Sequence, residues 1–216
     1  MNPRYQEWLD HVFNHEVKNP QWHFDSDAPV FEAPDSEIAE LLMQTFLNAG
    51  NDLAEYSDAQ VDQGIWYLAD PSCSSFMFAI KSSEVPLPKR LKAIESIFNL
   101  NLECYAKRCT EALGHLSETG SSLNSSCYMF WDVCPITSLD DVPEAKEMQD
   151  AILNVLEKTL TIEHRACRES ALHGLSEMTL WRPESVQEII DHFLSKTKLD
   201  KQLLTYALNV RDWYVR

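Results

Sequence analysis

The sequence predicts an all-α fold without a sheet of three or more strands. Apolar residues recur at i, i+3, i+4 and i+7 along most of the chain, which is the spacing that places them on one face of a helix. Glycine is scarce, with 5 among 216 residues, and β-branched residues form no alternating runs. Sheets need both turn glycines and a two-residue period. The apolar content of 44% is enough for one substantial hydrophobic core.

Residues 1–34 predict one short helix followed by an ordered loop. Tyr5, Trp8 and Val12 fall on one side of a helix that covers about residues 3–13. The following stretch has prolines at positions 20, 29 and 34 and few periodic apolar residues, which favours irregular structure over a helix. We expect its aromatic side chains to anchor the loop on the core: Trp22, Phe24 and Phe31.

Residues 35–134 predict helix pairs with a looser pattern. Asp35 or Ser36 can cap a long helix that runs to Tyr56, and Ser57 can cap a second helix over residues 58–69. A short helical segment is expected at 74–80. Prolines at positions 86 and 88 suit the opening turn of a helix over residues 86–109. A helix over residues 124–134 is apolar on nearly every side, so it should be central and buried.

Residues 143–216 predict two clear helical hairpins. Their four helices follow Pro143, a tight connection at 161–163, Pro183 and Asp200, and the last apolar stripe runs through Leu203, Ala207, Val210 and Trp213. Superposing Ala171 on Ala207 gives an offset of 36 residues, close to the roughly 40-residue period of HEAT and armadillo repeats. The expected architecture is therefore a single-domain α-α superhelix of HEAT/ARM-like helical hairpins.

Three segments carry a resemblance to a known group of proteins. They are residues 63–68 (QGIWYL), 127–132 (CYMFWD) and 170–175 (SALHGL). With them, the chain resembles uncharacterised bacterial proteins of HEAT/armadillo-type helical-repeat fold. The resemblance implies a fold and no activity, because none of the three segments contains a catalytic motif.

The cysteines and the apolar runs predict a protein of the cytoplasm. No basic region followed by an apolar run opens the sequence, so we expect no signal peptide. The longest apolar stretches fall far short of the roughly 20 residues that cross a bilayer. The six cysteines are scattered, and four of them have apolar neighbours at helical spacing, which favours reduced, buried thiols: Cys104, Cys127, Cys134 and Cys167.

The charge is strongly acidic and unevenly placed. The formal net charge is −16, and residues 1–80 alone hold 14 acidic and 2 basic side chains, a net of −12. An acidic chain repels nucleic acids and anionic lipid surfaces, so neither is an expected partner. Two interpretations stay open: the charge serves solubility, or it steers a basic protein partner to the N-terminal third.

No cofactor or metal site is expected. The glycines cannot form a phosphate-binding loop, and the G-x-S-x-G nucleophile motif is missing. His11 and His15 are four residues apart and could chelate zinc, but surface histidines beside acidic residues are the favoured interpretation. At about 100° per residue, His173 lies about 180° from His164 on a helix, which excludes a shared metal ion within that helix.

One helical face is a candidate binding stripe. Glu169, His173 and Glu177 are four residues apart, on the face opposite Cys167 and Ala171. Inner helices of a repeat array line its concave surface, so this stripe could form a groove wall, with flanking carboxylates that favour the protonated imidazole. The alternative is an ordinary exposed pattern of charges at i, i+4.

The aromatic residues Trp66, Tyr67, Tyr128 and Trp131 are further candidates for a binding surface. Their helical spacing among apolar neighbours equally fits a place in the core. Asp132 is the one charged residue in its apolar helix, and an unpaired buried carboxylate is costly, so we expect a cationic partner for it.

Three functional hypotheses follow from these patterns. The first is a protein-interaction module that presents an acidic surface to a basic or extended partner. The second is an immunity or inhibitor protein that neutralises a basic toxin or nuclease. The third is an enzyme with acid/base residues in the groove around Glu169 and His173, although no catalytic residue can be named.

Overall fold

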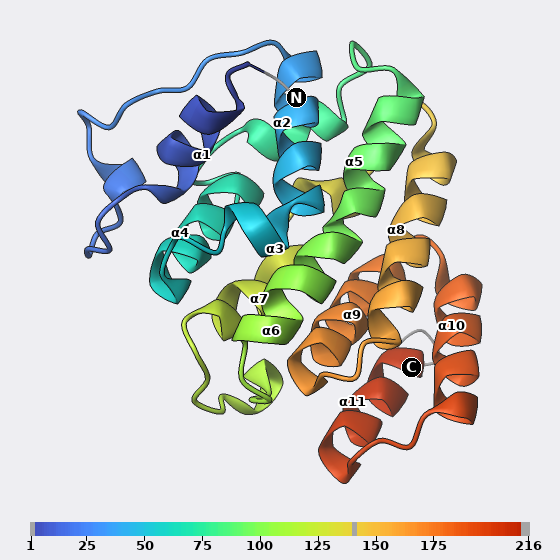
Figure 1. The fold of residues 1–216 in the computed structure, drawn as a ribbon. Coiled ribbons are helices and arrows are strands. Elements are labelled where there is room, and N and C mark those ends of the chain that lie inside the picture. The colour runs from blue at the N-terminus through green and yellow to red at the C-terminus, as the bar shows by residue number, and fades with distance from the viewer. Residues whose placement is uncertain (1–2, 140–141, 213–216) are drawn as a thin grey trace.

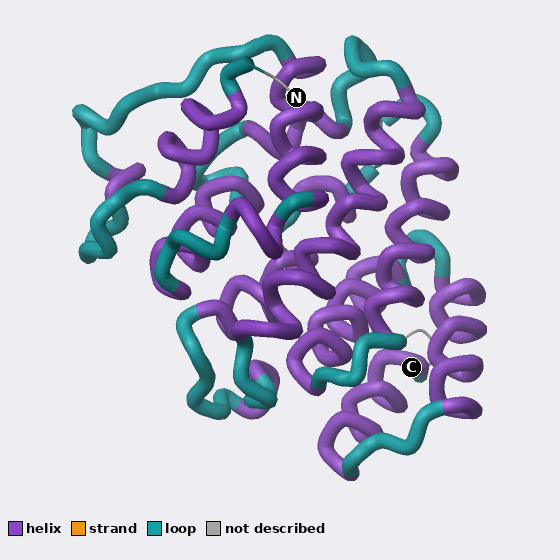
Figure 2. Tube along the Cα trace, in the orientation of Figure 1, coloured by secondary structure: helices purple, strands orange, loops and turns teal. Residues whose placement is uncertain are grey.

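The computed structural model describes residues 3–139 and 142–212 and is built of helices joined by loops (Figures 1 and 2). Helices make up 67% of the structure, and no strand occurs among the described residues. The all-α prediction is therefore confirmed.

Four helices lie side by side in a first row. They are α2 (Asp35–Leu47), α5 (Leu87–Asn99), α8 (Ala145–Leu160) and α10 (Pro183–Lys196), and each packs on the one before it (Figure 1). A π-helical turn, Leu100–Tyr105, continues α5 into α6 (Ala106–Arg108). The helix expected over residues 86–109 is thus present as one continuous rod.

A second row lies against the first. It consists of α4 (Asp58–Ala69), α7 (Leu123–Val133), α9 (Arg165–Met178) and α11 (Lys201–Arg211), with neighbours in contact throughout. Helix α1 (Tyr5–Phe13) packs on α4 and α2 at the N-terminal end of both rows (Figure 1). Short 3-10 turns punctuate the loops at Trp22–Phe24, Phe76–Ile80, Gly114–Leu116 and Pro135–Thr137.

Two predicted helix starts are confirmed with their caps. The Ser57 hydroxyl accepts the N–H of Gln60, whose side chain accepts the Ser57 N–H, which is a capping box at the start of α4. The Asp200 carboxylate accepts the N–H groups of Gln202 and Leu203 and caps α11. Trp213, expected in the stripe of the last helix, lies outside the described residues.

The long helix expected from residue 36 to 56 is wrong. The chain leaves the helix at Asn48, where φ is −100° and ψ is 10°, and resumes as the four-residue α3 (Ala49–Asp52). A Cβ atom at Gly50 would lie 3.0 Å from the Glu103 Cβ, so the turn there lets the π-helical segment approach closely. The apolar stripe continues across the break, which is why periodicity alone did not reveal it.

The core runs through both rows without interruption. Its largest fully buried side chains include Trp8, whose indole N–H donates to the Thr45 hydroxyl at 2.9 Å, and Trp131. All six cysteines are free, and the four predicted to be buried are buried. Within the described residues, none of the helices combines the length and apolar character that a bilayer crossing needs.

Candidate functional site

His173 is held in one orientation on the exposed side of α9. Its Nδ1 atom lies 3.0 Å from the carbonyl oxygen of Tyr128 on α7, and the two rings are 4.5 Å apart and tilted by 32°. A carbonyl oxygen can only accept, so in the neutral ring Nδ1 carries the proton. In that tautomer Nε2 is the nitrogen that can accept a hydrogen bond or bind a cation.

Two carboxylates converge on that imidazole. The His173 Nε2 atom is 3.9 Å from Glu177 Oε1, one helical turn further along α9. Asp132 of α7 completes the group, and one nitrogen or oxygen atom from each of the three side chains lies within 4.8 Å of the others. Asp132 is exposed, whereas His173 and Glu177 are half-buried.

The two carboxylates of this group have no lysine or arginine beside them among the described residues. Within the described chain, no lysine or arginine nitrogen lies within 4.0 Å of Asp132 or Glu177. Burial raises the pKa of Glu177, the charge of Asp132 raises it further, and His173 opposes both effects. The site therefore favours a cation.

A cleft of about 590 Å³ opens beside the group, between α9 and α11. Tyr206 forms one wall and stacks on the His115 ring at 4.4 Å with an interplanar angle of 11°. Burial and the neighbouring Tyr128 raise the pKa of Tyr206, so its hydroxyl stays protonated. The remaining lining consists of residues from the end of α9 and from α11: His173, Ser176, Glu177, Thr179, Leu180, Asn209 and Val210.

The acidic and aromatic surface extends along the second row to α4. Trp66 lies beside Met129 and Val133 of α7, and the Asp62 carboxylate accepts the N–H of Ser126 at 3.1 Å. A continuous set of partly exposed residues links α4, α7, α9 and α11. It contains no lysine or arginine. We call these residues the second-row strip: Asp62, Trp66, Tyr128, Met129, Asp132, Val133, His173, Ser176, Glu177, Tyr206 and Asn209.

Glu169 does not belong to this surface, and the prediction of an exposed stripe through it is wrong. Its side chain is 1% exposed. Its two oxygens accept the backbone N–H groups of Gly114 and His115 at 2.8 and 2.9 Å, and one also contacts the His115 Nδ1 atom. A loop distant in sequence covers this turn of α9. Glu169 thereby fixes the ring of His115 on which Tyr206 stacks.

The other predicted binding residues are divided between surface and core. Trp66 is partly exposed and lies on the second-row strip, whereas Trp131 is 0% exposed and belongs to the core. The expectation that Asp132 is buried beside a cation is wrong, because its side chain reaches solvent at the edge of α7 and meets His173.

The histidines near the N-terminus are packed and not free on the surface, which corrects the favoured interpretation. The His15 ring stacks on Trp22 at 3.6 Å, and the His11 Nε2 atom lies 3.1 Å from the Tyr67 hydroxyl. Burial, with the nearby His15, lowers the pKa of His11 to about 4. These side chains hold the proline-rich loop on α1 and α4.

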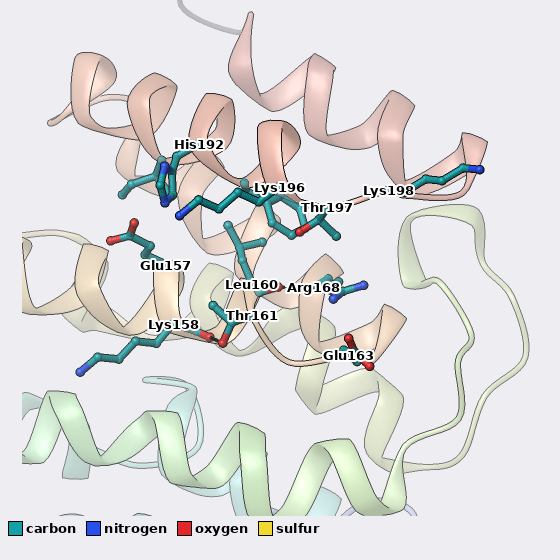
Figure 3. Close-up of a pocket in the computed structure, with 12 residues that line it drawn as sticks. Glu157, Lys158, Leu160, Thr161, Glu163, Arg168, His192, Lys196, Thr197 and Lys198 are labelled. Carbon is teal, nitrogen blue, oxygen red and sulfur yellow. Dashed lines mark hydrogen bonds between the residues drawn. The ribbon is translucent and has the colours of Figure 1, made fainter.

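A second hollow, of about 560 Å³, lies between the α8–α9 connection and α10 and is lined by several basic residues (Figure 3). The side chains of Lys158 and Lys198 extend away from it in opposite directions, and Glu157 lies on the same side as Lys196 (Figure 3). Arg168 donates to the carbonyl oxygen of Leu160 at 3.2 Å. Because its basic side chains point in different directions, this hollow does not form a binding site for one anion.

Comparison with known proteins gives no relative: no family model, curated protein or solved structure matches this chain. The function is therefore inferred from the chemistry of the second-row strip.

Several residues of the strip were not predicted from the sequence. Asp62, Tyr206 and Asn209 lie on the polar faces of helices whose apolar faces were located correctly. Only the packing of neighbouring helices brings them into line with His173, and no short-range pattern contains that information.

Proposed function

We propose that the chain is a short HEAT/armadillo-like array of the cytoplasm that binds a basic, extended segment of a partner protein along the second-row strip. One observation carries the proposal. The strip joins three carboxylates and several aromatic rings over the four helices of the second row and contains no lysine or arginine.

The arrangement of the helices supports a repeat array. Successive hairpins contribute one helix to each row, as α8 and α9 do, followed by α10 and α11. Ala171 and Ala207, the residues that define the 36-residue offset, are both fully buried on equivalent helices of the second row. Small residues at such positions let neighbouring helices approach closely.

The chemistry of the strip suits lysine and arginine side chains. Asp62, Asp132 and Glu177 offer carboxylates to ammonium or guanidinium groups, and the faces of Trp66 and Tyr128 can accept a cation–π contact. An extended segment laid across the helices would meet these groups in turn. The free cysteines are consistent with a reducing compartment.

Two carboxylates of the acidic N-terminal third, those of Glu40 and Asp52, are already engaged in contacts within the fold. The Lys89 ammonium lies 3.1 Å from Glu40, and the Tyr5 hydroxyl donates to Asp52 at 2.8 Å. Those carboxylates have roles in the fold. Asp132 and Glu177 have no lysine or arginine partner within the described residues, so their charge is available to a ligand.

One of the two residues on which the enzyme hypothesis rests, Glu169, is inaccessible. Glu169 is buried, accepts two backbone N–H groups and does not line the cleft beside His173, so a substrate bound there would not reach it. His173 remains accessible, but a lone imidazole beside two carboxylates specifies no reaction.

Charge reversal on the strip tests the proposal. The double variant Asp132→Lys/Glu177→Lys is compared with Glu95→Lys/Glu147→Lys, which changes two exposed acids of the first row and gives the same net charge. Binding is measured by fluorescence anisotropy against a panel of extended 15-residue peptides rich in Lys and Arg, with EDTA present, and against the same peptides with Gln at those positions. Circular dichroism confirms that the variants fold.

The strip variant should weaken binding of the basic peptides at least tenfold, or about 1.4 kcal/mol, and the first-row variant by less than about twofold. Equal losses in both variants would mean that only net charge matters. Failure of every basic peptide to bind the wild-type protein better than its Gln counterpart would overturn the proposal.

A further inference from the structure

The side chains of Asp132, His173 and Glu177 form a set of ligands that metal ions use. An imidazole nitrogen and two carboxylate oxygens are the donors of many zinc sites and of sites for other first-row divalent ions. The three atoms lie within 4.8 Å of one another. A bound zinc ion would lie roughly 2.0–2.2 Å from each of these atoms, so the side chains would have to turn toward it.

His173 is prepared for this role by a second contact. Its Nδ1 atom faces the Tyr128 carbonyl oxygen at 3.0 Å, so Nδ1 carries a proton, and Nε2 is the nitrogen that lies 3.9 Å from Glu177 Oε1. Histidines that bind metal ions commonly donate their other ring N–H to a carbonyl or carboxylate, which fixes the tautomer and the ring orientation. The contact is independent of the acidic residues and points to a ligand at Nε2.

The electrostatics and the shape of the site also suit a cation. Asp132 and Glu177 place two carboxylates within 4.8 Å of each other, and a divalent ion between them would remove the repulsion of like charges. The adjoining cleft of about 590 Å³ leaves room for water or another ligand on the open side. Three protein ligands with an open position are typical of exchangeable or catalytic sites more than of closed structural ones.

We propose that Asp132, His173 and Glu177 form a site for a divalent first-row transition metal ion, with zinc the best fit to the donor set. The ion would join α7 to α9 in the middle of the second-row strip. The inference does not rest on the proposed peptide binding, although the two ligands would compete for the same carboxylates.

The test is a titration of the full chain, stripped with chelator and free of peptide, with Zn²⁺ by calorimetry and with Co²⁺ by visible absorption. The variants are His173→Gln, Asp132→Asn and Glu177→Gln. The matched control is Glu188→Gln/His192→Gln, which removes a Glu and a His four residues apart on the exposed face of α10. Each single substitution keeps the side chain polar and close to its original size.

We expect one ion to bind per chain, each site variant to weaken binding at least tenfold, and the control to match the wild type. Absence of binding at about 1 mM metal would overturn the proposal. Binding that survives His173→Gln, or a Co²⁺ spectrum with thiolate charge-transfer bands, would assign the ion to other groups and overturn it equally. Because the peptide assay contains EDTA and this one contains no peptide, failure of either proposal leaves the other measurable.

Discussion

Asp62 and Glu169 are both carboxyl groups withdrawn from most of the solvent, but their surroundings differ. Glu169 accepts two backbone N–H groups and contacts the His115 ring. Asp62 accepts the backbone N–H of Ser126, and burial raises the pKa of Asp62 to about 6. The effect of burial exceeds that of the Ser126 hydrogen bond, so the ionised form is disfavoured and Asp62 destabilises the fold at neutral pH.

Asp62→Asn should therefore stabilise the protein at pH 7. The folded-state pKa of about 6 exceeds the reference value of 3.8, so the folded state holds the proton between about pH 4 and 6, and the cost of ionisation is fully present above pH 6. Such a shift corresponds to about 3 kcal/mol, and partial exposure reduces the expected gain to about 1–2 kcal/mol. Urea unfolding at pH 7 and pH 4 measures it, and a gain that does not shrink at pH 4 would contradict the pKa assignment.

Helix α9 shows what can and cannot be predicted from sequence at the scale of an element. Its apolar face, with Cys167 and Ala171, was located correctly because burial on one face imposes a 3.6-residue period. Its opposite face was not predicted correctly, because the segment Gly114–Leu116 covers Glu169 and because Asp132 of α7 lies beside His173. Contacts between distant segments leave no local pattern.

Gly174 is the point of closest approach on α9. A Cβ atom there would lie 2.5 Å from Leu156 Cδ2 and 2.8 Å from Trp131 Cγ. Gly174→Ala should therefore destabilise the protein by about 1–3 kcal/mol through overpacking, although alanine favours a helix by about 1 kcal/mol over glycine. Thermal unfolding measures the change, with Ser176→Ala on the same helix as the control. A Gly174→Ala variant that unfolds at a higher temperature than the wild type would show that α7 and α8 do not pack closely against α9 at this position.

At the scale of the whole molecule, the packing of the two rows determines which thiols are accessible. Cys73 and Cys109 are partly exposed, and Cys104, Cys127, Cys134 and Cys167 are buried in the core. Native protein should react with a thiol reagent such as DTNB at two cysteines, and at all six after denaturation. Rapid reaction of more than two cysteines under native conditions would mean that the rows open or that the core is less closed than described.

The net charge of −16 acts over the whole surface. A basic peptide that binds the second-row strip should associate more slowly as salt rises, because long-range attraction raises encounter rates by about 10–10³ at low ionic strength. Dissociation should change less. Stopped-flow association between about 20 and 300 mM salt measures this, and a rate constant that stays flat would leave the charge with a role in solubility only.

The recognition surface that we propose is the second row of helices. Hydrogen exchange of the full chain, with and without a bound basic peptide, locates the contact directly. We expect peptide binding to slow exchange in the helices that carry the strip, above all α7, α9 and α11, and to leave α2 and α5 unchanged. Protection confined to residues 35–58, where the sequence places much of the acidic charge, would contradict the account.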